Sequence, residues 1–170
     1  AAINHKLKIE NCKLKINIVA QGGDGATFDI GFGLVSGMWG RQETIIYVCY
    51  DNEAYMNTGA QASAATAYGA DTTTTPAGAE NRIGASLFKK DMIAIALAHG
   101  LKYVAQTTAA FPLDIANKVK KAMAVSGPSY IQILAPCIPG WKIEPSQTIK
   151  LAKLAAQTGI YPAIEYINGR

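Results

Sequence analysis

The amino-acid sequence predicts an α/β fold in three layers (α/β/α) with a mostly parallel sheet. Runs of apolar and β-branched residues alternate along the chain with segments of helical periodicity. These runs are short and continuously apolar, as in strands that helices cover on both faces. The composition, 49% hydrophobic and 16% charged over 170 residues, excludes a disordered chain and predicts one compact domain or part of a larger one. In such folds, ligands bind at the carboxyl ends of the strands.

The first half of the chain contains two predicted strands, a helix and a long loop. Residues 16–20 form a β-branched run that ends in the glycine-rich segment 21–25, where we expect the strand to become a loop. Residues 28–39 mix apolar with small residues, which predicts a tightly packed helix. Residues 44–50 predict a central strand. Residues 51–89 show no periodicity, and a loop of this length directly after a core strand favours a functional role.

The second half continues the alternation. Asp91 is a predicted N-cap for a helix over 92–99, which Gly100 ends, and a strand over 101–107 follows. A further strand is expected over 130–134 and the beginning of another over 160–170.

Prolines open the two remaining helices, at Pro112 and Pro145. The spacing of apolar residues in these helices predicts buried faces made of Leu113, Ala116, Val119 and Met123 in the first, and of Ile149, Leu151, Leu154 and Ala155 in the second. In the first helix, solvent-facing positions are expected at Lys118, Lys120 and Lys121.

Charge and cysteine content exclude several classes of protein. A net charge of +4 is too small to indicate nucleic-acid binding, and no apolar run approaches the roughly 18–20 residues of a membrane helix. The three cysteines contain no Cys-x-x-Cys pair, which favours a reducing, cytoplasmic environment. The chain lacks an initiator Met, so we expect it to be processed or cut from a longer sequence.

Two polar segments follow the first two predicted strands. Gly23-Asp24-Gly25 comes after the first strand and Asn52 after the second, with residues 26–51 between them. Glycines let backbone N–H groups approach a diphosphate, and Asp24 and Asn52 offer the oxygens that Mg²⁺ prefers. The alternative is that Gly-Asp-Gly is ordinary turn chemistry and Asn52 a loop residue.

The surroundings of this pair resemble a known family. The segments GGDGATFDIGFGLVSGMW, YVCYDNEAYMNTGAQASAATAYGADTTTTPAG, AIALAHGLKYVAQT and YIQILAPCIPGW resemble the β subunit of pyruvate:ferredoxin oxidoreductase (pyruvate synthase) and related 2-oxoacid:ferredoxin oxidoreductases. The resemblance covers about residues 16–145 and implies a thiamine diphosphate-binding domain over 16–170 that is incomplete at its C-terminus. Residues 1–15 do not match the family's pattern.

The resemblance implies roles for individual residues. Mg²⁺ is expected to bind Asp24, the Asn52 side chain and the Ala54 carbonyl, and to bridge them to the cofactor's diphosphate. The remaining cofactor contacts implied by the resemblance are Gly23, Gly25, Asn57, Thr58 and Gly59.

Cys137, in the segment APCIPGW, matches a ligand of the family's [4Fe–4S] cluster, although a lone cysteine is more often a small buried apolar residue. The family's other three cluster cysteines lie in a region that this chain lacks, and Cys12 does not match them. Cys49, inside the second strand, is expected in the core. The cluster is therefore doubtful in this chain alone.

The resemblance also implies an activity, which is oxidative decarboxylation of pyruvate to acetyl-CoA with electrons passed through iron–sulfur clusters to ferredoxin. The expected partners are α, γ and δ subunits or fused equivalents, ferredoxin, pyruvate and coenzyme A, and the activating Glu is expected from the α subunit, which leaves no catalytic residue in this chain. Two alternatives stay open: a truncated cofactor-binding remnant without catalysis, and another thiamine enzyme such as an acetolactate synthase or decarboxylase, against which YMNTG, TTTTPAG and APCIPGW argue.

Overall fold

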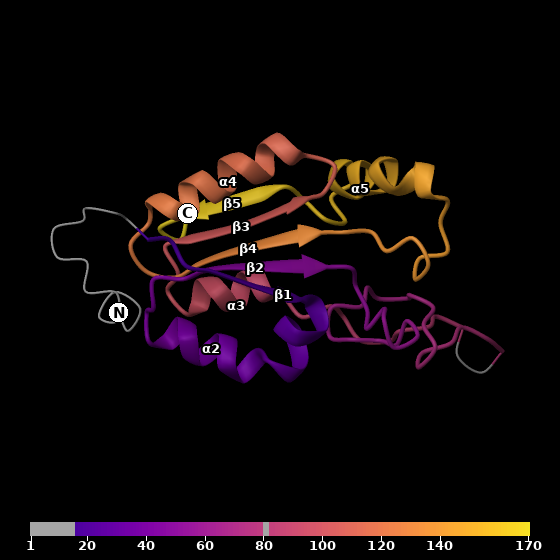
Figure 1. Cartoon of the computed structure of the whole chain (residues 1–170). Coiled ribbons are helices and arrows are strands. Elements are labelled where there is room, and N and C mark those ends of the chain that lie inside the picture. The colour runs from indigo at the N-terminus through magenta and orange to yellow at the C-terminus, as the bar shows by residue number, and fades with distance from the viewer. Residues whose placement is uncertain (1–15, 80–81) are drawn as a thin grey trace, which may run out of the picture.

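The computed structural model describes residues 16–79 and 82–170 and shows five strands between two layers of helices (Figure 1). The strands are β1 (Val19–Gly23), β2 (Ile46–Asp51), β3 (Tyr103–Thr108), β4 (Ser129–Leu134) and β5 (Ile164–Ile167). They lie in the order β1-β2-β4-β3-β5; the first four are parallel, and β5 is antiparallel to β3. The predicted α/β/α fold with a mostly parallel sheet is confirmed.

Helices cover both faces of the sheet, as Figure 1 shows, with α2 and α3 on one face and α4 and α5 on the other. The helical elements are a π-helical turn (Gly25–Ile30), α2 (Phe32–Gly40), α3 (Met92–Ala98), α4 (Pro112–Ala124), a 3₁₀ turn (Pro145–Gln147) and α5 (Thr148–Gln157). Two apolar clusters fill the space between the layers. No helix in the described ranges has the length and apolar character needed to cross a membrane.

The first strand runs later than predicted. We expected a strand over 16–20 and a loop over 21–25, but β1 continues to Gly23 and a helical turn follows Asp24 directly. The glycines misled the prediction because glycine is unfavourable in strands. Gly22 is needed here, because a Cβ at this position would overlap the Tyr47 hydroxyl on the neighbouring strand.

The prediction of which face of α4 is buried was wrong: the buried face is rotated about the helix axis from the predicted one. Leu113 is 81% exposed, whereas Lys118 and Ala122 are buried. Lys118 leaves solvent because both carboxylate oxygens of Asp114 accept hydrogen bonds from its ammonium, at 2.7 and 2.6 Å. Apolar periodicity alone cannot locate a face that includes a buried ion pair.

The last helix shows a similar difference. Ala152 is the buried residue of α5, while Ile149 and Leu154 are exposed, contrary to the prediction that they face the core. Leu151 and Ala155, also predicted on the buried face, are half-buried.

The long loop after β2 is irregular, as predicted, apart from an isolated bridge between Tyr55 and Gln61. Its described part extends from the carboxyl ends of the strands (Figure 1). The N-terminal segment, residues 1–15, and with it Cys12, lies outside the described residues.

Candidate cofactor and metal site

The two predicted polar segments meet at the carboxyl edge of the sheet. Strands β1 and β2 are paired with Gly23 opposite Tyr50, so Asp24 and Asn52 leave the sheet side by side. A pocket of about 230 Å³ opens at this point. It is lined by Gly23, Asp24, Gly25, Asn52, Ala54, Asn57 and Thr58 of the predicted site, and by Ala26, Ile30, Tyr55 and Met56.

The three predicted magnesium ligands converge. One terminal atom of the Asn52 amide lies 2.7 Å from the Ala54 carbonyl oxygen and 3.0 Å from Asp24 Oδ1. If this terminal atom is the amide nitrogen, it donates hydrogen bonds to both oxygens. If it is the amide oxygen, the oxygens of Asn52, Ala54 and Asp24 lie together, and a cation bound among them would compensate their negative charge. A carboxylate, an amide oxygen and a carbonyl are the hard ligands that Mg²⁺ takes. The residues present therefore fit this ion.

Asp24 is held in an environment that disfavours its own charge. It is 2% exposed and accepts one hydrogen bond from the Ser63 hydroxyl, at 2.9 Å. Burial, with a further contribution from the nearby Asp51 carboxylate, raises the pKa of Asp24 from 3.8 to about 6. A carboxylate arranged in this way gains strongly from a bound cation.

Gly25 is fixed by close packing against the long loop. A Cβ on Gly25 would overlap the ring of Tyr55, whose hydroxyl donates to Asp29 Oδ2 at 2.9 Å. The π-helical turn begins at Gly25 itself, and such turns are rare and found mostly at functional sites. The glycine thus lets the loop close over the end of β1.

Of the three loop residues predicted to contact the cofactor, two line the pocket and one does not. Asn57 and Thr58 line the pocket. Gly59 does not line it, but its φ of 115° lies in the left-handed region that favours glycine. Gly59 therefore shapes the turn.

Cys137 lies next to this site. In its loop, the Trp141 indole donates to the Asn52 carbonyl at 2.9 Å, and a Cβ on Gly140 would lie 3.3 Å from Cys137 Sγ. Within the described ranges, no group of three or more His, Cys, Asp and Glu could hold a metal ion. Cys137 can thus be one thiolate of the four that a cluster requires, and the described residues do not build the cluster.

Cys49 is a core residue, as predicted. Its side chain is fully buried in β2, and burial raises the pKa of the thiol to about 12. It remains protonated and inert at neutral pH.

Sequence reasoning missed an ion-pair cluster beside the site. Lys89 Nζ lies 2.6 Å from Asp51 Oδ2 and 3.0 Å from Glu53 Oε1. Lys89 is 38 positions from Asp51 and 36 positions from Glu53 along the chain, and no pattern in the sequence indicates that residues so far apart are partners.

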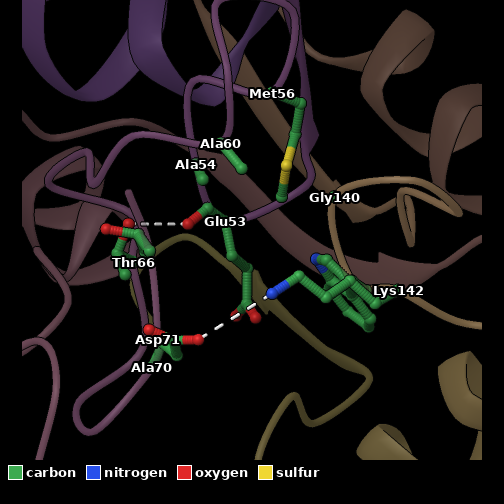
Figure 2. Close-up of a pocket in the computed structure, with 11 residues that line it drawn as sticks. Glu53, Ala54, Met56, Ala60, Thr66, Ala70, Asp71, Gly140 and Lys142 are labelled. Carbon is green, nitrogen blue, oxygen red and sulfur yellow. Dashed lines mark hydrogen bonds and ion pairs between the residues drawn. The ribbon is translucent and has the colours of Figure 1, made fainter. Parts of the chain in front are cut away.

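A second pocket, of about 310 Å³, shares Ala54 and Met56 with the first and contains Glu53 and Trp141 in its lining. Figure 2 shows Glu53, Asp71 and Lys142 pointing toward one another in it. Lys142 Nζ lies 3.9 Å from Asp71 Oδ2, and both side chains are exposed.

Comparison with known proteins identifies the family of the chain. Residues 1–133 match the family described as "Thiamine pyrophosphate enzyme, C-terminal TPP binding domain". Pyruvate synthase subunit PorB of Methanocaldococcus jannaschii is 51% identical over 155 residues, which are 91% of this chain and 52% of that protein. Ketoisovalerate oxidoreductase subunit VorB of Pyrococcus furiosus is 44% identical over 169 residues, 99% of this chain and 53% of that protein. The chain spans about half the length of these relatives.

A solved structure is also similar. The 2-oxoglutarate:ferredoxin oxidoreductase from Magnetococcus marinus, with 2-oxoglutarate, coenzyme A and succinyl-CoA bound, superposes with a TM-score of 0.65 at 32% identity, covering 72% of this chain and 40% of that one. The predicted thiamine diphosphate-binding fold is confirmed by these matches. Because the family match covers most of the chain and includes both strand ends that form the pocket, the chain belongs to the thiamine pyrophosphate enzyme family, through its C-terminal TPP-binding domain.

Proposed function

We propose that this chain is the thiamine diphosphate- and Mg²⁺-binding part of a pyruvate (2-oxoacid):ferredoxin oxidoreductase. The single observation that carries the proposal is the convergence of Asp24, Asn52 and the Ala54 carbonyl at the ends of two parallel strands. The relatives named as pyruvate synthase subunits supply the substrate class. The whole protein would convert pyruvate and coenzyme A into acetyl-CoA and CO₂ and pass two electrons to ferredoxin.

Within this function, the chain's own residues bind and orient. Asp24, Asn52 and Ala54 would hold Mg²⁺, while Gly23 and Gly25 leave room for the diphosphate. Thiamine diphosphate, when bound, supplies the electron sink for decarboxylation. Asn57 and Thr58 border the same pocket and would contact the diphosphate side of the cofactor, with Gly59 shaping their turn.

The remaining functions are assigned to partners. We expect the activating Glu on an α subunit, and γ and δ subunits or fused equivalents to complete a cytoplasmic complex that docks ferredoxin. Cys137 is proposed as one ligand of a [4Fe–4S] cluster in the assembled protein. Its loop contacts the metal-binding turn through Trp141, which supports a cluster close to the cofactor.

The first test is isothermal titration of thiamine diphosphate into the purified chain with and without Mg²⁺. Magnesium-dependent binding that Asp24→Ala abolishes supports the site. Unchanged cofactor affinity in Asp24→Ala contradicts it. If the wild-type chain alone does not bind, the titration is repeated with the α subunit, where continued absence of binding identifies a remnant without cofactor function.

A further inference from the structure

The residue between two of the proposed magnesium ligands has a strained backbone. Glu53 lies between Asn52 and Ala54 and has a φ of 70°. This left-handed conformation is unfavourable for residues other than glycine. At this turn, one terminal atom of the Asn52 side chain lies within 3.0 Å of both the Ala54 carbonyl oxygen and Asp24 Oδ1. The ligand geometry thus depends on a conformation that Glu53 does not favour by itself.

Three contacts hold Glu53 in this conformation. Its N–H donates to Asp51 Oδ1 at 3.0 Å. Its carbonyl accepts from the Thr66 hydroxyl at 2.7 Å, which is one of the dashed lines in Figure 2. Its carboxylate pairs with Lys89 at 3.0 Å. Backbone donor, backbone acceptor and side chain are therefore each restrained, and by different parts of the chain.

These restraints are anchored in the protein interior. Asp51 is fully buried, and its Oδ2 also accepts from Gln132 on β4 at 2.9 Å and from the Tyr161 hydroxyl at 3.0 Å. Lys89 reaches the same oxygen at 2.6 Å. Burial lowers the pKa of Lys89, but the two carboxylates outweigh it and the pKa is raised overall, so the ammonium stays charged. The Lys89–Asp51 ion pair therefore joins the end of the long loop to its beginning.

We propose that Glu53, held by Lys89 and Thr66, is a positioning residue that preorganises the Mg²⁺ ligands Asn52 and Ala54 toward Asp24. This inference rests on the proposed function. It gives the ion-pair cluster of Lys89, Asp51 and Glu53 the role of holding the turn that carries two of the proposed Mg²⁺ ligands. A site whose ligands are prearranged binds its ion without first ordering the turn, and supporting contacts of this kind typically change metal affinity about 10–100-fold.

The experiment compares Glu53→Ala with Glu53→Gly. Both remove the carboxylate, but glycine adopts a positive φ without strain. We expect Glu53→Ala to raise the Mg²⁺ concentration needed for half-maximal thiamine diphosphate binding about 10-fold, and Glu53→Gly to raise it clearly less. Excess Mg²⁺ should restore cofactor binding in both, which a loss of folded structure would not allow. Thermal melting checks that each variant is folded.

Substitution of Thr66 gives a second test, in which no charged residue is changed. Thr66→Val removes the hydroxyl that holds the Glu53 carbonyl. It should raise the Mg²⁺ concentration needed for half-maximal thiamine diphosphate binding about fivefold, the equivalent of one hydrogen bond, and Thr66→Ser should behave as wild type. The matched control is Glu165→Ala, an ion-paired glutamate on β5 away from the site, which should leave the Mg²⁺ requirement unchanged.

The results separate two failures. If Asp24→Ala abolishes binding but Glu53→Ala and Thr66→Val stay within twofold of wild type, the positioning role is overturned and the proposed function stands. Equal losses in Glu53→Ala and Glu53→Gly also overturn it, because strain relief would then have no effect. If wild type shows no magnesium-dependent binding with or without the α subunit, both proposals fail.

Discussion

At the scale of single residues, the proposed Mg²⁺ ligand Asp24 lies where burial disfavours its charged form. Asp24 is buried, and its raised pKa means that the folded chain binds a proton more tightly there than the unfolded chain does. A group of this kind stabilises the fold below its unfolded pKa, and that stability is lost as the pH rises through the folded value. The proposed Mg²⁺ site would thus use a charge that the cation-free fold disfavours.

This residue gives a pH prediction. In the absence of Mg²⁺, the contribution of Asp24 to the free energy of unfolding should fall between pH about 4 and about 6. Asp24→Asn should remove that part of the pH dependence, make the chain more stable at pH 7, and abolish magnesium-dependent cofactor binding. Urea denaturation from pH 4 to pH 8 measures the first two effects. Asp71→Asn, on the surface, should keep the wild-type profile.

Two glycines give a matched packing prediction. Gly22→Ala would overlap the Tyr47 hydroxyl, whereas a Cβ on Gly33 in α2 meets nothing within 4 Å. We expect Gly22→Ala to lower the free energy of unfolding by about 1–3 kcal/mol. Gly33→Ala should raise it by about 0.5–1 kcal/mol because alanine favours the helix. Thermal denaturation compares them, and equal effects would contradict the close approach at Gly22.

At the scale of elements, α4 is held to the sheet by a hydrogen bond between β3 and the acidic partner of an ion pair within the helix, as well as by apolar contacts. Lys118 is buried and pairs with Asp114, which also accepts from the Thr107 hydroxyl of β3 at 2.5 Å. Burial alone would raise the pKa of Asp114, but the hydrogen bonds from Lys118 and Thr107 lower it overall. The stability from this group is present above its unfolded pKa and is lost as the pH falls through the folded value.

Removing one partner of this pair should be costly. Asp114→Asn leaves the Lys118 ammonium buried without a counter-charge, so we expect the free energy of unfolding to fall by about 2 kcal/mol, less than for a fully buried pair because Asp114 is partly exposed. Lys120→Met, at an exposed position of the same helix, should change it by less than about 0.5 kcal/mol. Similar losses in the two variants would refute the role of the buried pair.

At the scale of the whole molecule, large apolar side chains are exposed beside the cofactor pocket. Ile30 borders the pocket and is 83% exposed, and Leu34, one turn later in α2, is 81% exposed. The proposed function places an α subunit against this part of the chain, because the activating Glu is proposed to lie on that subunit. Apolar side chains gathered at a site are typical of an interface.

Substitution at Leu34 tests this arrangement. Leu34→Asn removes little buried area, so the free energy of unfolding should change by less than about 0.5 kcal/mol. Association with the α subunit should weaken about 10-fold or more, in the range of interface hot spots. Ile149→Asn, on the exposed side of α5, is the control and should assemble normally. Analytical ultracentrifugation of the mixed subunits measures both, and equal assembly would contradict the predicted contact.

The alternation of strands and helices and the interior position of β2 could be predicted from the sequence, because they depend on local patterns: apolar runs, turn residues and the order of elements. The roles expected of Asp24 and Asn52 rest on the family resemblance and stay predictions. The buried faces of α4 and α5 could not be predicted from local patterns, since Lys118 is buried by a partner that periodicity ignores and Ala152, rather than Leu154, is the buried residue of α5.

The surroundings of the site were decided by tertiary structure alone. Ser63, Thr66 and Lys89 reach Asp24, Glu53 and Asp51 only after a long irregular loop folds back on the strand ends. No periodic pattern encodes such contacts, because each depends on where the loop closes rather than on spacing along the chain. The sequence by itself determined the layers of the fold and which residues carry the proposed ligand oxygens. The folded chain determined how those oxygens are brought together and held.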